Sequence, residues 1–521
     1  MIRWQSLWQF IFALYRRFEN NNDKFIEPSN LRSPFWRMEE SGIVFSASGG
    51  RVAQIEEQFV AQALNTRWQD FDRATQSAAC ALVFDSLAVG VAGYCAAHAA
   101  QVSAAVAGWG GACGSGGDAR GFILGGATGG WSPAQAAFVN AFQIHAQEFD
   151  CVHEPAVAHP MATVCAALLA EAARAPVHGA DFLAAVIAGI EVVATLGVAA
   201  RTGPRFFRPA LAGVFGSALA LARLRKVPRA TARAALGHAL SFASGTMQAH
   251  VEGKPTLALQ VAHAARSAVE ACDLACAGIP APDDAISGPF GYLALFEDET
   301  DIRSALAQTD RAWRVTEVSI KPFPTGRAAH GGLTALREAM VDHGLSAENL
   351  VRFTYRAPPL IARLVGRPAK PDMTVAYARL CFAWLAALQL TQGRVALSAF
   401  TQERLSDPVL LALAQRFAIE DDGTADPAAF GPGEAIVECR DGRSIVIGVS
   451  RQPGAPDYPL DEAELLDKAA ECLAFGGLAQ DRGTREGDAH AAAKALHEAV
   501  LAIPGQRDVV ATLKPLLTVR R

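Results

Sequence analysis

From residue 54 to residue 306 the chain is a succession of alanine-rich segments whose apolar residues recur every three or four positions. That spacing puts the apolar side chains on one face of an α-helix, and alanine favours the helix more than any other residue. Short Gly/Pro loops separate the segments, as between 162–175 and 180–199, which together predict a hairpin of two packed helices. This part of the chain is therefore predicted to be a large all-helical domain.

Beyond residue 313 the chain becomes rich in β-branched and aromatic residues that partly alternate. Three segments carry this pattern: WRVTEVSIKPF at 313–323, LVRFTYRAPP at 350–359 and AIVECRDGRSIVIGVS at 435–450. Such alternation is typical of strands, and Asp441-Gly442 in the third segment is a hairpin turn signal. We therefore expect a small sheet in this part of the chain.

Helical patterns at 326–343 and 373–392 lie between the predicted strands, so this part is predicted to be an α+β domain. From Asp461 the pattern is helical again and is expected to return to the large domain. The predicted fold is mainly α, a large helical domain interrupted by a smaller α+β domain. The expected boundaries are 1–50 for an N-terminal extension, 51–314 for the first part of the large domain, 315–455 for the α+β domain and 456–521 for the returning helices.

Residues 1–37 differ from the rest of the chain, being aromatic and Asn-rich. Their apolar run from Leu7 to Tyr15 is too short to span a bilayer, and it lacks the features of a signal peptide. An interfacial amphipathic helix is one interpretation. We favour an upstream extension, poorly ordered, with the functional chain beginning near Met38.

Charge and cysteine usage exclude several classes of partner. The 47 Lys and Arg residues against 52 Asp and Glu give a formal net charge of −5, so no basic field exists for nucleic acid or an anionic membrane. The ten cysteines are scattered in apolar surroundings, which predicts buried free thiols in a reducing cytoplasm. Cys272 and Cys276 lie one helical turn apart and could share a metal, although no second pair of ligands accompanies them. The glycine-rich stretch at 108–130 lacks both a strand–helix frame and a GxxxxGK[ST] motif, so we expect no nucleotide cofactor.

The densest group of polar residues is HAQEFDCVHEPAVAHP at 145–160, which holds three imidazoles and three carboxylates between two alanine-rich segments. Its prolines make it a loop, so its side chains can converge on a cleft. An imidazole beside a carboxylate is the usual arrangement for general acid–base catalysis. The alternatives are a set of loop caps and surface hydrogen bonds, or a zinc or iron site. The eight- and six-residue spacings of the histidines do not match HExxH, so we expect no metal.

A second group, SIKPFPTGRAAHGG at 319–332, is predicted to begin as a strand and to turn at two prolines into a helix. The junction would carry Lys321, Arg327 and His330, and a helix start with adjacent cations favours a bound anion. The alternative is a solvated basic turn. Arg208 and Lys254 stand in otherwise apolar loops, where a charge needs a partner or an anionic ligand.

From about residue 54 onward the chain resembles the MmgE/PrpD family of 2-methylcitrate dehydratase-like enzymes. The family's HALDFDDVHxxxxxHP loop reads HAQEFDCVHEPAVAHP at 145–160, and its KPYPxxRxxH-type segment reads KPFPTGRAAH at 321–330. The segment GAPDYPLDEAELLDK at 454–468 resembles the family's junction before its last helices. Several motifs in the same order make this resemblance specific.

The resemblance implies a large helical domain, a small α+β lid, a cleft between them that holds the active site, and a homodimer. It also implies chemistry on small di- or tricarboxylic acids without metal or organic cofactor. His159 and Lys321 match the family's active-site positions, and Asp150 matches a motif position. We expect His159 as the acid–base group, Asp150 or Glu148 as its partner, and Lys321 as the cation that stabilises the dianion formed on proton removal. The expected substrate-binding residues are Arg208, Lys254, Arg327, His330 and His153.

The sequence also departs from the family pattern. Glu148 stands where the family usually has the first aspartate of its loop, and Cys151 replaces the last. Phe207 and Leu257 stand where a loop histidine and a lysine are expected, and Ala383 stands where the decarboxylase has a tyrosine. These differences argue against simply copying the methylcitrate or aconitate activity.

The sequence therefore predicts a cofactor-independent lyase, a dehydratase in the first place and a decarboxylase in the second, that acts on a small di- or tricarboxylic acid. An isomerase or epimerase of a small dicarboxylic acid is the nearest alternative, because it uses the same proton removal without a leaving group. A non-catalytic binding or assembly protein is the alternative from another class.

Overall fold

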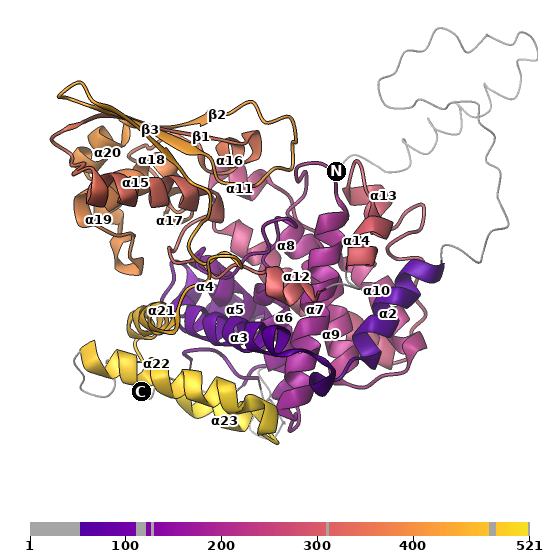
Figure 1. Ribbon diagram of the computed structural model, residues 1–521. Helices are drawn as coiled ribbons and strands as arrows, with labels where there is room; N and C mark the ends of the chain where they lie inside the picture. The colour runs from indigo at the N-terminus through magenta and orange to yellow at the C-terminus, as the bar shows by residue number, and fades with distance from the viewer. Residues whose placement is uncertain (1–52, 111–120, 127–129, 309–311, 479–485, 519–521) are drawn as a thin grey trace, which may run out of the picture. The chain divides into compact units, whose positions relative to one another are not determined.

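A computed structural model of the protein describes residues 53–110, 121–126, 130–308, 312–478 and 486–518 (Figure 1). The predicted extension at 1–50 lies outside these residues, as does about half of the glycine-rich stretch at 108–130. The described residues belong to one compact unit.

Helices dominate the described chain, and the prediction of a mainly α fold is confirmed. Up to residue 308 the helices are α2 (Ala53–Asn65), α3 (Arg73–Gly93), α4 (Ala99–Ala107), α5 (Pro133–Ala146), α6 (Pro160–Ala172), α7 (Gly179–Ala199), α8 (Arg208–Leu211), α9 (Gly213–Leu224), α10 (Arg229–Phe242), α11 (Gln248–Glu252), α12 (Thr256–Cys276), α13 (Tyr292–Phe296) and α14 (Ile302–Gln308). The later helices are α15 (His330–Asp342), α16 (Pro359–Val365), α17 (Val375–Ala378), α18 (Phe382–Gln392), α19 (Gln402–Leu405), α20 (Pro408–Ala414), α21 (Glu462–Phe475), α22 (Glu486–Ala502) and α23 (Val509–Leu517). Short 3₁₀ turns are η2 (Trp68–Asp70), η3 (Arg314–Glu317), η4 (Arg327–Ala329), η5 (Leu397–Ala399) and η7 (Ile503–Gly505).

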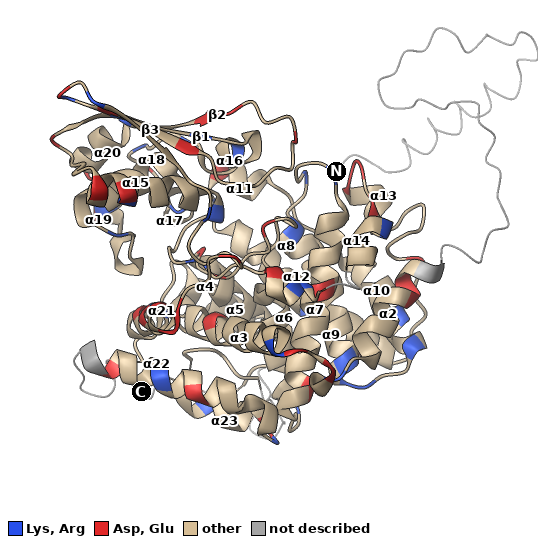
Figure 2. Cartoon of the chain, in the orientation of Figure 1, with Lys and Arg blue, Asp and Glu red and all other residues tan. Residues whose placement is uncertain are grey.

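Small residues let the helices of the first part pack closely. Helix α12 packs against α5, α9 and α10, and α7 packs against α9. Figure 2 shows that long stretches of these helices carry no Lys, Arg, Asp or Glu, and α5 has none at all. At the crossing of α7 and α9, Gly216 lies so close to Gly189 that an added Cβ would stand 2.5 Å from the Gly189 carbonyl oxygen. The alanine-rich pattern therefore corresponds to a densely packed helical interior.

Helices α3 and α7 are long and apolar enough to cross a membrane by length and composition alone. Their most apolar windows are 78% and 94% buried inside the protein, respectively. Both helices therefore form part of the packed interior, as expected for long core helices.

The strands form one four-stranded sheet in the order β2-β1-β3-β4. They are β1 (Leu350–Ala357), β2 (Phe417–Asp421), β3 (Glu434–Cys439) and β4 (Ser444–Gly448). β1 is parallel to β2 and antiparallel to β3, and β3 and β4 form the hairpin predicted from Asp441-Gly442. The alternating residues Phe353, Tyr355 and Val437 are buried, and α15, α16 and α18 pack against the sheet.

The predicted strand at 313–323 is wrong. Residues 314–317 form the 3₁₀ turn η3. Ser319 makes only an isolated bridge with Val152 of the polar segment at 145–160, which we call the acidic loop. The Arg314 backbone N–H donates to the buried Glu191 carboxylate at 2.9 Å, so a distant partner takes the bond that a strand would use. The prolines at 322 and 324 have no N–H to give to a sheet.

One other predicted element differs in the structure, and one strand was not predicted. The helical pattern at 373–392 is divided by residues 379–381 into α17 and α18, since the buried Arg379 guanidinium is drawn to carbonyl oxygens of Gln147 and Pro324. β2 carries too short a pattern to have been predicted.

The segment at 319–321 is held between two distant parts of the chain. Ser319 and Val152 exchange backbone hydrogen bonds of 2.8 and 3.0 Å, and the Ile320 N–H donates to the Gly454 carbonyl at 2.9 Å. Gly454 has φ 82°, and a side chain there would meet the Ile320 carbonyl oxygen. The neighbour of these residues, Lys321, is thereby fixed beside the acidic loop.

After the sheet the chain returns to the helices of the first part, and α21 and α22 both pack against α3. The Asp461 side chain caps α21 by accepting from the Glu464 N–H at 2.8 Å. The boundaries at 315 and 455 stay a prediction, because the described residues group as one unit.

The nine cysteines within the described residues are free thiols. Seven of them are buried, as the composition predicted, whereas Cys95 and Cys276 are exposed. Burial raises the pKa of the Cys272 thiol to about 12.

We predict that Gly216→Ala destabilises the protein, because the new methyl group would meet Gly189 and Val193 across the α7–α9 crossing. Overpacking of this kind costs about 1–3 kcal/mol, which scanning calorimetry would register as a lower melting temperature. Gly505→Ala is the control, since nothing lies within 4 Å of a Cβ added there. Equal melting temperatures for the two variants would contradict the packing described.

Candidate active site

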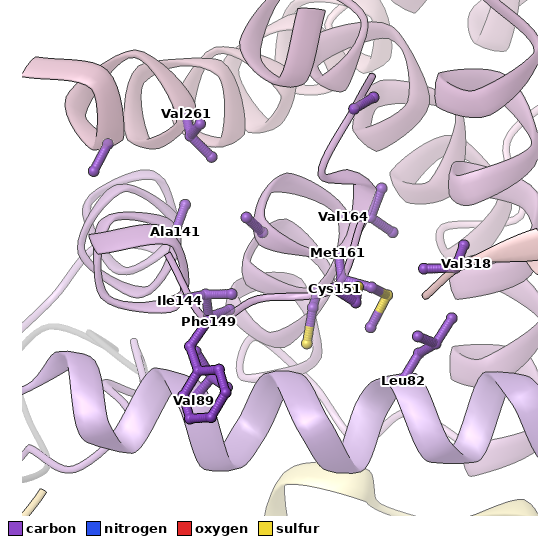
Figure 3. Packing of buried hydrophobic residues seen from close by; sticks show 14 of the residues in the cluster. Leu82, Val89, Ala141, Ile144, Phe149, Cys151, Met161, Val164, Val261 and Val318 are labelled. Atoms are coloured by element: carbon purple, nitrogen blue, oxygen red, sulfur yellow. The ribbon is translucent and has the colours of Figure 1, made fainter. Parts of the chain in front are cut away.

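The acidic loop joins α5 to α6 and is anchored by side chains that alternate in direction. Phe149 and Cys151 are buried in the apolar core, where Figure 3 shows them near Val89 of α3 and Met161 of α6. Between and before them, Glu148 and Asp150 face polar partners instead. Packing of Phe149 and Cys151 in the core thus holds the carboxylates of Glu148 and Asp150 in place.

Asp150 is the centre of the site and is fully buried. Its Oδ2 atom lies 2.9 Å from His145 Nδ1 in the last turn of α5, and 3.2 Å from His159 Nδ1 just before α6. Its Oδ1 atom lies 3.8 Å from Lys321 Nζ. Three of the predicted residues therefore converge, together with His145, which the sequence cluster contained but which had not been assigned a role.

The surroundings keep the Asp150 carboxyl ionised. Burial by itself would raise its pKa, but the charges and hydrogen bonds of His159 and His145 hold the pKa well below its ordinary value. The carboxylate in turn favours an N–H at Nδ1 of each imidazole, which leaves both Nε2 atoms for other partners.

The two imidazoles respond to this carboxylate in opposite directions. Burial lowers the pKa of His159, and Lys321 adds to this effect against the pull of Asp150. Burial would also lower the pKa of His145, but Asp150 and Glu148 together raise it above its ordinary value. The site therefore favours the neutral form of His159 and the protonated form of His145.

Glu148 is held in a left-handed backbone conformation with φ 49°, which is uncommon for a residue with a side chain. Lys321 is fully buried and donates to the Glu148 carbonyl at 2.9 Å, with the Glu148 Oε2 atom 3.5 Å away. Burial would raise the pKa of Glu148, but Lys321, His145 and His159 lower it. The ammonium of Lys321 thus neutralises the loop's own carboxylates.

Two further cations bind backbone carbonyls of the loop, and neither could be predicted from the local residue pattern. Lys468 of α21 donates to the Phe149 carbonyl at 3.0 Å and pairs with the buried Asp85 of α3 at 2.5 Å. Arg379 donates to the Gln147 carbonyl at 2.8 Å, and burial lowers its pKa to about 9. The loop is therefore clamped by the C-terminal helices and by the α17–α18 junction.

A cavity opens at His145, Glu148 and His159. The His159 side chain is 14% exposed, whereas that of His145 is 2% exposed, so His159 presents more of its ring to the cavity. Phe207 and Leu257, the positions where the resemblance had led us to expect a histidine and a lysine, both line its wall. Ala383 is not among the residues that line it.

Two of the predicted binding cations reach this cavity, and both are paired. Arg208 donates from Nε and Nη2 to the two oxygens of Glu297, each at 2.9 Å. Arg327 donates from Nε to Glu154 at 2.7 Å. Glu297 comes from a segment far away in sequence, so its pairing with Arg208 could not have been predicted.

The other predicted binding residues do not line the cavity. His153 accepts from the Ala156 N–H at Nδ1, and its Nε2 lies 2.8 Å from Glu317, so both ring nitrogens are occupied. His330 lies behind Arg327, with its Nδ1 atom 3.3 Å from Arg327 Nη1. Lys254 is exposed and lines a neighbouring cavity that shares His145 and Glu148 with the first. Their binding roles stay predictions.

His145, Asp150 and His159 offer metal-ligand atoms within 4.8 Å of one another. A divalent ion would have to displace the protons between the imidazoles and Asp150, and its charge would face the Lys321 ammonium 3.8 Å from Asp150. We therefore favour a cluster in which protons, and not a metal ion, lie between the imidazoles and Asp150.

Comparison with known proteins agrees with this arrangement of motifs. The family model for the MmgE/PrpD N-terminal domain matches residues 57–305, and that for the MmgE/PrpD C-terminal domain matches residues 323–492. The chain belongs to the MmgE/PrpD family. The acidic loop lies within the first of these ranges, and Lys321 lies two residues before the second range begins.

Three relatives among known proteins have names that describe an activity. The cis-aconitate decarboxylase of Mus musculus is 28% identical over 358 residues, which cover 64% of this chain and 71% of the relative. The cis-aconitate decarboxylase of Homo sapiens is 27% identical over 303 residues, covering 55% of this chain and 61% of the relative. A cis-aconitate decarboxylase-like protein of Aspergillus oryzae is 25% identical over 372 residues, covering 65% and 75%.

We predict that Asp150→Asn lowers the pKa of His145. The change removes the first of the two charges that raise this pKa and leaves the burial that lowers it. The imidazole titration, followed by NMR of protein labelled at histidine, should move to lower pH than in the wild type.

Glu317→Gln is the matched control. It removes the carboxylate that faces His153, so it should lower the pKa of His153 and leave that of His145 unchanged. A His145 titration that is the same in wild type and Asp150→Asn would show that Asp150 does not set its protonation.

Proposed function

We propose that the protein is a cofactor-independent lyase that acts on a small carboxylic acid by removing a proton from the carbon next to a carboxylate. The observation that carries this proposal is the pair of buried imidazoles on one carboxylate, with pKa values shifted in opposite directions. Two titratable groups whose environments separate their pKa values are suited to act as base and acid in one reaction. Membership of the MmgE/PrpD family and the decarboxylase relatives support the same class.

Dehydration is the reaction we propose first. The Nε2 atom of neutral His159 takes the proton from the carbon next to the carboxylate. The electron pair left behind forms a C=C bond as the neighbouring C–O bond breaks. Protonated His145, whose Nε2 is buried without a hydrogen-bond partner among the described residues, gives its proton to the departing hydroxyl, which leaves as water.

Decarboxylation is the second candidate, because the relatives are named for it. In that reaction the bond to a carboxylate carbon breaks, CO₂ leaves, and the electron pair remains on the substrate carbon until an imidazolium protonates it. The same two imidazoles serve both reactions, and product analysis separates them.

Lys321 acts through the acidic loop in this proposal. Its ammonium faces Glu148 and Asp150, so it lowers the cost of burying their charges and keeps Asp150 ionised between the imidazoles. It is thus a positioning residue for the acid–base pair. The role at the substrate carboxylate that the resemblance suggested would require its ammonium to leave the Glu148 carbonyl oxygen.

A screen of small carboxylic acids tests the proposal. We expect at least one acid to raise the melting temperature with EDTA present and to be converted to an unsaturated acid that absorbs in the ultraviolet. His159→Gln should lower kcat by about 10²- to 10⁴-fold while the acid still binds, because the variant loses only the base. His238→Gln on α10 is the control, since this ring bonds to the Ile279 carbonyl outside the cavity.

Full turnover by His159→Gln would refute the acid–base assignment. Loss of ligand stabilisation on adding EDTA would instead show that the His145, Asp150 and His159 cluster holds a metal. Substrate that is recovered with deuterium and inverted configuration after reaction in deuterated water would identify an epimerase. A ligand that binds and is never converted would identify a binding protein.

The two imidazoles also predict the pH dependence of kcat/KM. His159 must be neutral, and its lowered pKa means that activity is lost only as the pH falls below about 6.5. His145 must be protonated, and its raised pKa means that activity is lost as the pH rises above about 6.5. We expect a bell-shaped profile with one limb on either side of this value.

His145→Gln should lower the rate and remove the alkaline limb, while the acid limb remains. A profile for the wild type with only one limb between about pH 5 and pH 9 would contradict the two-imidazole mechanism.

A further inference from the structure

Much of the wall of the active-site cavity consists of hydrocarbon, and one of its rings, Phe207, lies beside His145 with ring centroids 5.8 Å apart. Side chains from five separate segments contribute to it, among them Phe206, Phe207, Met247, Leu257, Leu380 and Phe430. Phe207 and Leu257 are almost fully buried, with exposed fractions of 7% and 6%. A wall of this kind favours an apolar group of the ligand and makes an unpaired charge costly.

The two arginines that line the cavity are already paired with carboxylates. Arg208 is bound at two points by Glu297, and its Nη2 also donates to the Thr202 carbonyl at 2.7 Å. Arg327 is bound by Glu154 at Nε and by the Pro453 carbonyl at Nη1. Its Nη2 atom is buried without a hydrogen-bond partner among the described residues, so its N–H groups remain for a ligand oxygen.

The ion pairs at the cavity are formed within the protein. Lys321 faces Glu148 and Asp150, Arg327 pairs with Glu154, and Arg208 pairs with Glu297.

The remaining imidazole of the wall adds no charge. Burial, assisted by the neighbouring Arg367, lowers the pKa of His250 to about 4. Lys254 is exposed to solvent in the adjoining cavity, where Asp372 of opposite charge also lines the wall. A carboxylate placed against Phe207 and Leu257 would lose its hydration to hydrocarbon side chains.

We infer that the substrate carries a hydrocarbon arm against the wall formed by Phe207 and Leu257, in place of the third carboxylate of a tricarboxylic acid. The inference rests on the proposed function, since the carboxylate end must reach the two imidazoles. One carboxylate oxygen would bind Arg327 Nη2, and the arm of about four carbons would lie against the aromatic and aliphatic side chains. This acid differs from cis-aconitate, the tricarboxylate in the names of the relatives.

A pair of acids of equal shape tests this inference. Citrate and 2-isobutylmalate share one skeleton, except that an isopropyl group in the second replaces one terminal carboxylate of the first. We expect isothermal titration of the full chain at fixed ionic strength to give a Kd at least about tenfold lower for 2-isobutylmalate. Removal of the isobutyl arm, as in malate, should weaken binding again.

The variant Leu257→Lys places a cation in the hydrocarbon wall at the start of α12. It should reverse the preference, so that citrate binds more tightly than 2-isobutylmalate. Leu274→Lys is the matched control, because it makes the same change on the same helix at a side chain that is 37% exposed and outside the cavity. This control should keep the wild-type preference.

Failure of the inference and failure of the proposed function give different results. Tighter binding of citrate than of 2-isobutylmalate by the wild type, with turnover of citrate, would overturn the inference and leave the lyase proposal standing. The absence of binding by either acid would overturn both. An equal effect of the two lysine variants would show that Leu257 does not face the ligand and would also overturn the inference.

Discussion

The site depends on one buried carboxylate. Asp150 has no exposure to solvent, and an ionised carboxyl in that position needs compensating donors and positive charge. His145 and His159 supply these on one oxygen, and Lys321 supplies them on the other. Because the three partners come from α5, the start of α6 and the segment after η3, the carboxylate also joins parts of the chain that lie far apart in sequence. The proposed acid–base chemistry and the tertiary structure therefore both depend on the ionised form of Asp150.

The fold could be predicted from sequence where the pattern is local. The hairpin of α6 and α7, helix α12 and the β3–β4 turn follow from periodicity and from Gly/Pro signals, and these predictions are confirmed. The expectation failed at 313–323, where β-branched residues form η3 because Arg314 bonds to Glu191 from a different helix. The residue pattern of a segment indicates the secondary structure that the segment favours by itself, and a hydrogen bond to a distant residue can override that preference.

The site, too, could be predicted only where its residues lie close together in sequence. The concentration of histidines and carboxylates at 145–160 indicated the loop, since so polar a group is rare in so apolar a chain. It did not indicate that Arg208 and Arg327 have carboxylate partners of their own, because Glu297 and Glu154 carry no sequence signal of that pairing. These pairs connect segments of the cavity wall that lie far apart in sequence.

The alternation along the acidic loop has a consequence for how this chain can diverge. Phe149 and Cys151 lie in the core, and Glu148 and Asp150 face the polar cluster. Successive side chains in this part of the loop therefore point to opposite sides, as they do along a strand. A substitution at any one position leaves the other three where they are. Insertion or deletion of a single residue would turn the aromatic ring toward the cavity and the carboxylate toward the core. The length of this segment is thus under a stricter constraint than its composition, and homologous chains should differ here by exchange of residues, not by gaps.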